Sequence, residues 1–280
     1  MKKVLSFILS LGFLFVVDAY AAVPLSRQAD STALFKDARV EVLRPGVVWT
    51  STVTFWKGEP RSLNVVTISS SQLQGLEFAY PEILTKTSVQ CEAVDALVGI
   101  NGQFFNGDGT AVDFLKIDGK VLAEGADGRS ATFASGVFVF DDTGADVRKV
   151  DANEGARHLP DANVMCCGPI LLENGECTTL NMESSFNTTP HPRTAIGVTS
   201  DGRVILATID GRFPGQAIGM STPLMQEYMT LLGAHSALNL DGGGSTTLYI
   251  KGYGVVNHAC DGLNWDAPNE RKVSSIIYLK

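Results

Sequence analysis

The segment SALNLDGGGSTTLYI, residues 236–250, places an acid and three glycines between two short apolar runs. Consecutive glycines cost conformational entropy on folding, so a packed strand has little use for them. They do allow a sharp turn and the close approach of a ligand to bare amides, and successive N–H groups in such a turn can bind an anion. We therefore interpret the segment as a functional loop between two strands, with Asp241 at its mouth and Gly242, Gly243 and Gly244 as its backbone.

The hydroxyl side chains of Ser245 and Thr246 follow the glycines directly and add hydrogen-bond donors to the same loop. An acid beside bare amides and hydroxyls is a combination suited to chemistry on a polar or anionic ligand. The alternative is a glycine-rich hairpin turn in which Asp241 only caps backbone amides. This segment alone leaves both interpretations open.

Two other segments repeat the pattern of a short apolar run that ends in Asn or Asp followed by Gly. Residues 97–100 end at Asn101 and residues 204–209 end at Asp210, as the first apolar run above ends at Asp241. Short apolar runs bounded by glycine predict buried strands. We therefore expect three polar side chains at three strand ends to contribute to one shared site.

Four motifs in order carry a resemblance to a known family: NGQFFN at 101–106, PRTAIG at 192–197, IDGR at 209–212 and NLDGGGS at 239–245. Together they resemble the phosphodiester glycosidase family, and weaker matches extend the resemblance over roughly residues 60–280. The resemblance implies a hydrolase that cleaves the glycosyl–phosphate bond of a sugar-1-phosphodiester, with N-acetylglucosaminidase-like specificity. Gln103 and the pair Ser274-Ser275 depart from the family pattern and bear on the substrate rather than on the fold.

The chemistry implied by the resemblance fits the residues present. A leaving phosphomonoester is already a stable anion near neutral pH, so its departure needs positive charge and N–H donors more than a proton. Arg193 offers a bidentate fork to phosphate. Asp241 and Asp210 supply the carboxylates expected of glycoside cleavage, with Asp241 as the reacting one. These three are the predicted catalytic residues; the predicted substrate-binding residues are Asn101, Gly102, Phe104, His191, Gly242, Gly243, Gly244, Ser245, Thr246 and Arg271.

Three other functions compete with this hypothesis. The protein could be a glycosidase of a non-phosphorylated envelope polysaccharide, or an envelope glycan-binding module without turnover. A cysteine hydrolase using Cys166 or Cys167 with His158 or His191 has less support, because no nucleophile motif surrounds the cysteines. No cofactor is required; a Ca or Mg ion is conceivable at residues 107–109, but no EF-type pattern of acids follows them.

The first 21 residues have the three parts of a secretory signal peptide. Lys2 and Lys3 form a basic start, residues 4–17 are apolar, and residues 19–21 read Ala-Tyr-Ala, a small-residue cleavage site. We therefore expect a bacterial periplasmic or secreted protein with no membrane span after signal removal. The formal net charge of −8 argues against a nucleic-acid partner, whereas a carbohydrate or sugar-phosphate substrate remains compatible with it. The oligomeric state is left open.

Short strands separated by Asp-Gly turns predict an α+β fold that is a β-rich single domain, with a mixed or antiparallel sheet and few helices. Residues 22–59 are expected to form an N-terminal arm and the first strands, and residues 60–280 the phosphodiester glycosidase-like domain. One helix is clearly signalled, with Thr222 as its cap, Pro223 in its first position and Gly233 after its end.

The five cysteines predict a disulfide, because an exported protein folds in an oxidising compartment. Cys177 is expected to bond to Cys166 or to Cys167. Five is an odd number, so one thiol is left over.

A hairpin predicts the geometry of the site. Residues 194–199 and 204–209 are apolar runs, and Asp201-Gly202 between them is typical of a two-residue turn. In that register Arg193 lies directly opposite Asp210, with Cβ atoms roughly 5 Å apart. The prediction is a cation and a carboxylate side by side, both within reach of the reacting carboxylate.

Overall fold

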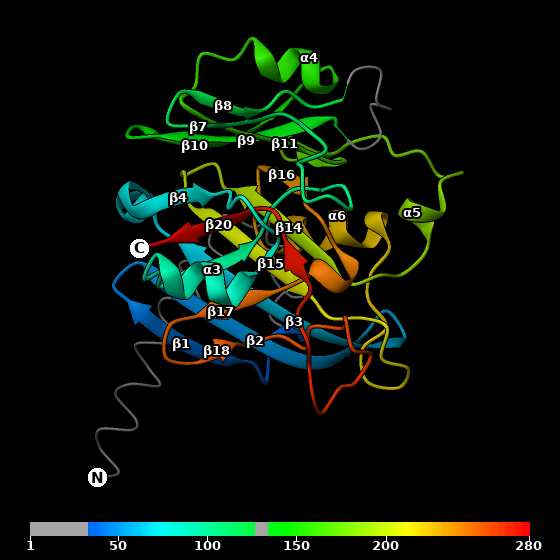
Figure 1. Cartoon of the computed structure of the whole chain (residues 1–280). Helices are drawn as coiled ribbons and strands as arrows, with labels where there is room; N and C mark the ends of the chain where they lie inside the picture. Colours follow the sequence, from blue (N-terminus) through cyan, green and yellow to red (C-terminus); the bar gives the residue numbers. More distant parts are fainter. Residues whose placement is uncertain (1–32, 127–133) are drawn as a thin grey trace.

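An antiparallel sheet of eight strands crosses the middle of the molecule in the computed structural model, which describes residues 33–126 and 134–280 (Figure 1). Its strand order is β1-β2-β3-β15-β14-β16-β12-β13. The strands are β1 Arg39–Arg44, β2 Val47–Trp56, β3 Glu59–Ile68, β15 Val204–Ile209, β14 Arg193–Val198, β16 Ser236–Asn239, β12 Ile170–Glu173 and β13 Glu176–Cys177.

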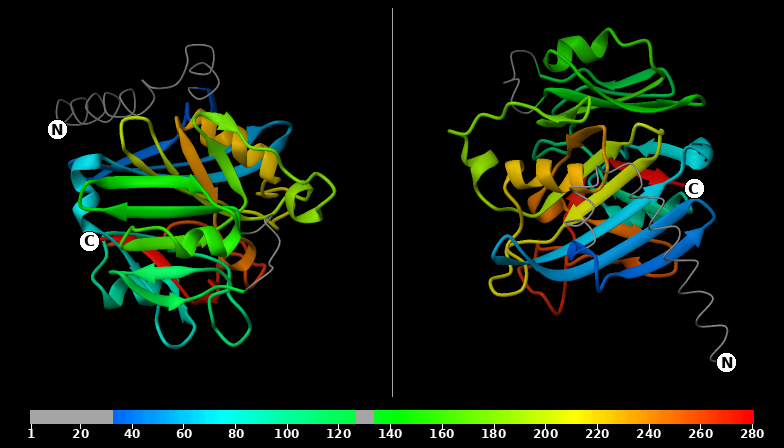
Figure 2. Two further views of the ribbon diagram at one scale, coloured as in Figure 1. Left: turned by 90° about the horizontal axis from the view of Figure 1, so that it is seen from above. Right: turned by 180° about the vertical axis from the view of Figure 1, so that it is seen from behind.

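Two further sheets of five strands and a two-stranded ribbon complete the β structure. The first five-stranded sheet, at the top of Figure 1 and of the right-hand view in Figure 2, contains β10 Gly144–Lys149, β9 Gly136–Asp141, β11 Asn163–Cys167, β7 Leu115–Ile117 and β8 Lys120–Ala123. The second contains β18 Gly254–Val255, β17 Leu248–Ile250, β6 Val98–Asn101, β20 Ile276–Leu279 and β4 Leu76–Ala79. The ribbon pairs β19 Lys272–Val273 with β5 Thr85–Lys86.

The helices are short and lie between strands. They are α3 Thr87–Ala93, α4 Ala152–Arg157, α5 Ser185–Thr188 and α6 Thr222–Leu231, with 3-10 turns η1 Ser70–Gly75 and η2 Gly243–Ser245. The signals for α6 are confirmed with a shift of one residue at its start: Ser221 is the N-cap, Pro223 lies in the first turn, and Gly233 follows the end with a φ of 84°.

The central strands β14 and β15 are buried along their whole length because both of their faces are covered. On β14 and β15, Ile196 and Leu206 belong to the core that the eight-stranded sheet shares with the two five-stranded sheets. Ala195 and Ala207 belong to a second core with Tyr228 and other side chains of α6. The expected β-rich α+β domain is confirmed; it is built from antiparallel pairs between its named strands.

The predicted signal peptide, residues 1–21, lies outside the described residues. β1 and β2, from the predicted N-terminal arm, continue the main sheet through pairing with β3. In the parts of the chain that the structure describes, helices are too short or too polar to cross a membrane.

The hairpin of β14 and β15 corrects the predicted register by one residue. Arg193 pairs with Ile209 rather than with Asp210. The loop has three residues, since Thr199 N–H donates to Arg203 O at 2.9 Å and Gly202, with a φ of 80°, closes the turn. A three-residue hairpin loop ends in a left-handed residue, so the Asp-Gly pair fits this turn as well as the two-residue one. The predicted pairing of the cation with the carboxylate is therefore wrong.

The predicted disulfide is also absent: all five cysteines, each within the described residues, are free thiols. Cys166 and Cys167 are buried in β11 of the upper sheet, whereas Cys177 is exposed on β13, the edge strand of the main sheet. Cys177 therefore lies in a different sheet from Cys166 and Cys167, its two predicted partners.

Candidate active site

Three strand ends meet at the candidate site, as the sequence predicts. β6 ends at Asn101, β15 leads into Asp210, and β16 leads into Asp241. Asp241 N–H donates to Gly102 O at 3.1 Å, which joins the β6 and β16 ends directly. Asn257 joins the third, because its Nδ2 donates to Asp210 Oδ1 at 3.0 Å and to the backbone oxygen of the residue after Ser245 at 3.1 Å.

The carboxylate of Asp241 has a raised pKa and faces two charged side chains. Burial is the main cause and raises the pKa of Asp241 to about 6. The hydroxyl of Ser245 and the amide of Gly242 lie beside the carboxylate and oppose this rise. The positive charges of Arg271 and Arg212 oppose it too. Two guanidinium groups therefore approach an acid that titrates close to neutral pH.

The glycines after Asp241 are needed for packing under those guanidinium groups. A Cβ at Gly243 would lie 3.0 Å from Nη2 of Arg212, and a Cβ at Gly244 would lie 2.6 Å from Nη2 of Arg271. Arg271 is held in this position by Asp261, whose Oδ1 accepts from its Nε at 2.9 Å. The missing side chains therefore let two cations lie directly on the backbone of the loop.

The expected anion-binding row of three amides is not formed. Gly242 N–H donates to Oδ1 of Asp241 at 2.9 Å, and Gly243 N–H donates to Pro192 O at 2.9 Å. Two of the three predicted donors are thus already used within the protein. The positive charge at the site comes from side chains instead.

Arg193 is a buried structural cation rather than an open phosphate ligand in this structure. Its Nε donates to Met220 O at 3.0 Å, its Nη2 donates to Phe186 O at 2.5 Å, and only 2% of the residue is exposed. Its guanidinium lies over the Phe186 ring, 4.6 Å from the centroid. Burial lowers the pKa of Arg193 to about 10, so the side chain remains charged at neutral pH.

Asp210 is fully buried, and its oxygens are occupied by the protein. Oδ1 accepts from Asn257 Nδ2 at 3.0 Å and from His258 N–H at 2.9 Å, while Oδ2 accepts from Ser62 Oγ at 2.5 Å. Burial raises the pKa of Asp210, and these hydrogen bonds oppose the rise. Asp210 therefore fixes the loop after Asn257 and does not orient Arg193.

Asn101 has a similar structural role, in contrast to its predicted contact with a sugar hydroxyl. Its Nδ2 donates to Asp241 O at 2.7 Å, and its Oδ1 accepts from Thr194 Oγ1 at 2.8 Å and from Thr247 N–H at 3.1 Å. The residue is completely buried. Asn101 therefore holds the backbone of the loop that carries Asp241 in position.

The remaining predicted substrate-binding residues surround the loop with different exposure. His191 is partly exposed, and its pKa is lowered by burial and by the charges of Arg193 and Arg212. Phe104 is partly buried, with its ring 6.1 Å from that of Phe186. Ser245 and Thr246 are buried, as is Gly102, whose amide donates to Ser275 O at 2.8 Å.

Arg212 lies close to Asp241 but is missing from the predicted site residues, although it is the last residue of the motif IDGR. It is exposed and has a φ of 67°, and its Nη1 lies 4.0 Å from Sγ of Cys260. The next residue, Phe213, packs edge-on against Trp265 with a centroid distance of 5.2 Å. Trp265 in turn stacks on His258 at 3.5 Å. These aromatic contacts fasten the loop that carries Arg212 to the loop that ends at Arg271.

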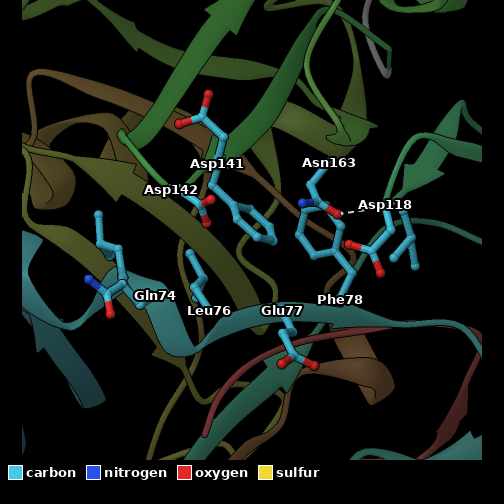
Figure 3. Close-up of a pocket in the computed structure, with 11 residues that line it drawn as sticks. Gln74, Leu76, Glu77, Phe78, Asp118, Asp141, Asp142 and Asn163 are labelled. Atoms are coloured by element: carbon cyan, nitrogen blue, oxygen red, sulfur yellow. Dashed lines mark hydrogen bonds between the residues drawn. The ribbon is translucent and has the colours of Figure 1, made fainter.

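Among the residues that the structure describes, no group of three or more His, Cys, Asp or Glu side chains could hold a metal ion. The acidic cavity of about 270 Å³ in Figure 3 lies elsewhere, between β4 and the upper sheet. Two of its four acids have ordinary structural partners: Glu77 pairs with Lys280 at 3.0 Å, and Asp141 Oδ1 accepts from Thr143 N–H at 2.7 Å. None of the predicted site residues lines it.

Comparison with known proteins identifies the family. Residues 95–280 match the family described as phosphodiester glycosidase. The SPbeta prophage-derived uncharacterized protein YomE of Bacillus subtilis (strain 168) is 31% identical over 176 residues, which cover 60% of this chain and 26% of that protein. The matched part is thus about a quarter of the length of YomE.

Solved structures share the fold. The zebrafish N-acetylglucosamine-1-phosphodiester alpha-N-acetylglucosaminidase catalytic domain, auto-inhibited by its pro-peptide, superimposes with a TM-score of 0.67 at 18% identity, covering 87% of each chain. A hypothetical protein from Synechocystis has a TM-score of 0.61 at 18% identity, covering 87% of this chain and 64% of that one. The chain belongs to the phosphodiester glycosidase family.

Proposed function

We propose that this protein is a secreted hydrolase that cleaves the glycosyl–phosphate bond of a sugar-1-phosphodiester. One observation carries the proposal: the carboxylate of Asp241, with a pKa of about 6, lies in the field of two guanidinium groups, those of Arg212 and Arg271. The groups lie on Gly243 and Gly244, where a side chain would displace them. Paired cations suit a leaving phosphate, and a carboxylate suits the carbon from which it leaves.

The bond changes follow from this arrangement. The bond between the anomeric carbon and the phosphate oxygen breaks, and the phosphomonoester leaves with the electron pair, stabilised by Arg212 and Arg271. Ionised Asp241 stabilises the positive charge that develops at the sugar carbon and accepts a proton from the water that replaces the phosphate. Asp210 takes no part in this scheme, because its oxygens are occupied.

We further propose that the sugar of the substrate is N-acetylglucosamine. The zebrafish enzyme with the same fold is named for that sugar, and the chain shares its family. The signal-like sequence of residues 1–21 supports export. Cell fractionation of the expressing bacterium, with sequencing of the mature N-terminus, tests the export step.

The activity test compares two substrates of the same sugar. We expect the purified protein to hydrolyse an N-acetylglucosamine-1-phosphodiester at least about a hundredfold faster than 4-nitrophenyl N-acetylglucosaminide. Both leaving groups depart as anions, but only the phosphate has the oxygens that two guanidinium groups can bind. Equal rates would favour a glycosidase of non-phosphorylated glycans. Binding of both without turnover would favour a glycan-binding module.

The pH profile tests the role of Asp241 independently. If the ionised form reacts, kcat/KM for the phosphodiester falls as the pH drops below about 6, the pKa of Asp241. A general acid would give the opposite slope, with activity lost above that pH. The leaving phosphate needs no proton, so we expect the first profile.

A further inference from the structure

A second cavity lies beside the short helix α5, whose residue Asn187 lines it. Its volume is about 520 Å³, within the roughly 300–1,000 Å³ typical of ligand sites. It is bordered by β12, β13 and the end of β10, and by the segment that leads to α5, at the right of Figure 1. No predicted site residue lines it.

The cavity contains a buried acceptor without a partner. Asn187 is completely buried and lines the cavity, and its Oδ1 has no hydrogen-bond partner among the described residues. Its Nδ2 donates to Asn181 O at 3.0 Å, which fixes the amide in place. An unpaired buried acceptor is unfavourable, so Asn187 Oδ1 is suited to an N–H or O–H donor from a ligand.

The walls of the cavity are held by the protein before any ligand arrives. Ile170 N–H donates to Ser135 Oγ at 2.9 Å, and Thr178 N–H donates to Leu171 O at 3.1 Å. Gln226 Nε2 from α6 donates to Thr178 O at 2.8 Å. A preformed site avoids the ordering cost that weakens binding.

The lining mixes hydroxyl and amide groups with aliphatic side chains. Thr179 and Asn181 supply polar groups, and Val150, Ile170 and Leu180 supply apolar surface. Three charged residues, Lys149, Asp151 and Glu173, also line the cavity. Sugar rings present both kinds of surface, with hydroxyl donors and acceptors at the rim and C–H groups on the faces.

We propose that this cavity is a second binding site, which takes an uncharged saccharide unit with a hydroxyl or N-acetyl N–H donated to Asn187. The helix α5 links the cavity to the candidate active site through two hydrogen bonds: Phe186 O accepts from Arg193, and Pro192 O, one residue before Arg193, accepts from Gly243 N–H at 2.9 Å. Phe186 lies under the Arg193 guanidinium and next to Phe104, and the following residue, Asn187, faces the cavity. A glycan longer than one unit could therefore occupy both sites. The binding of one glycan across both sites rests on the proposed function, whereas the binding of a saccharide in the cavity does not.

Cys177 provides a direct reporter, because it lines the cavity and is exposed while the other four cysteines are buried. The experiment measures the rate of Cys177 alkylation by iodoacetamide in the full chain, using mass spectrometry. We expect millimolar chitotriose to slow the reaction at least fivefold and glycerol to leave it unchanged. The buried cysteines show in the same spectra that the fold stays intact. Unchanged alkylation with chitotriose and with maltotriose would overturn the proposal.

A substitution that fills the cavity with a large side chain gives the second measurement. Cys177→Trp should abolish saccharide binding measured by calorimetry, while Cys177→Ser, the matched control, should retain it. In the active enzyme, Cys177→Trp should lower kcat/KM for an oligosaccharide phosphodiester at least fivefold and leave the single-sugar substrate unchanged. Retained binding by Cys177→Trp would place the saccharide elsewhere. The alkylation and calorimetry measurements need no turnover, so their outcome is independent of the hydrolysis assay.

Discussion

The loops after β15 and β16 begin with the same sequence, an apolar strand followed by Asp-Gly, yet their acids have opposite environments. Asp210 accepts hydrogen bonds from Ser62, Asn257 and His258. Asp241 accepts from the amide of the next residue and faces the charges of two arginines across the site. A buried acid whose oxygens are occupied stabilises the fold, whereas one left with cationic neighbours is available for chemistry.

The difference shows that the position of an acid at a strand end does not define its role. What decides it is the number of fixed donors that surrounding loops supply. The comparison of Asp210 with Asp241 can be tested at both acids and at the cations around them.

The largest effect is expected for Asp241→Asn. Removal of the reacting charge should lower kcat on a sugar-1-phosphodiester by roughly a thousandfold or more. A steady-state assay measures this, with circular dichroism as the control for folding. Activity within tenfold of wild type would assign the chemistry to another residue.

The next effect is on stability and concerns Asp210→Ala. The change leaves Asn257 and the amide of His258 without their acceptor, so the free energy of unfolding should fall by about 3 kcal/mol. Urea denaturation at pH 7 measures it. Asp210→Asn is the matched control and should lose less, because its amide can donate to Ser62 Oγ. If Asp210→Ala melts like wild type but is inactive, the two acids share one role.

Smaller losses are expected for the cations that face Asp241. Arg212→Ala and Arg271→Ala should each lower kcat/KM for the phosphodiester roughly a hundredfold, through lost stabilisation of the leaving phosphate. Lysine at either position should restore part of the activity, because it keeps the charge but not the fork. Arg39→Ala, on the exposed strand β1, is the control and should leave the activity unchanged. Equal losses on a simple glycoside would contradict a role in phosphate binding.

The smallest effect is the pH dependence of stability. The pKa of Asp241 rises from 3.8 to about 6 on folding, so the native state binds more protons than the unfolded state between these values. Stability is therefore lost as the pH rises through about 6. Asp241→Asn removes this loss and should be more stable than wild type by about 1–2 kcal/mol above pH 7, with no difference near pH 4. Thermal melts at several pH values measure the difference.

The sequence predicted that three strand ends meet, because short apolar runs followed by Asx-Gly signal buried strands. It did not predict which of the acids would be occupied. The donors to Asp210 come from Ser62 and from residues 257–258, which are far away in sequence. No local sequence pattern predicts these contacts. Arg212 was visible in its motif, but only the folded loop brings it onto Gly243.

The hairpin error has a local cause. Asp201-Gly202 is compatible with loops of two or three residues, and the choice depends on Thr199, whose Oγ1 donates to Asp201 Oδ1 and accepts from Arg203 N–H at 3.0 Å. A one-residue difference in loop length reverses the face of every following side chain relative to its partner strand. Arg193 consequently interacts with α5 and the backbone near Met220 instead of with Asp210.

Asn101 makes assembly of the site a late event in folding. Its side chain binds residues separated from it by 93, 140 and 146 positions along the chain. Contacts of such long range form only after large loops have closed, and proteins rich in them fold more slowly. The loop of residues 241–247 therefore depends on Asn101, a distant residue, for its final shape. A chain still being synthesised would gain this geometry around Asp241 only after residues 241–247 had been made and had packed against Asn101.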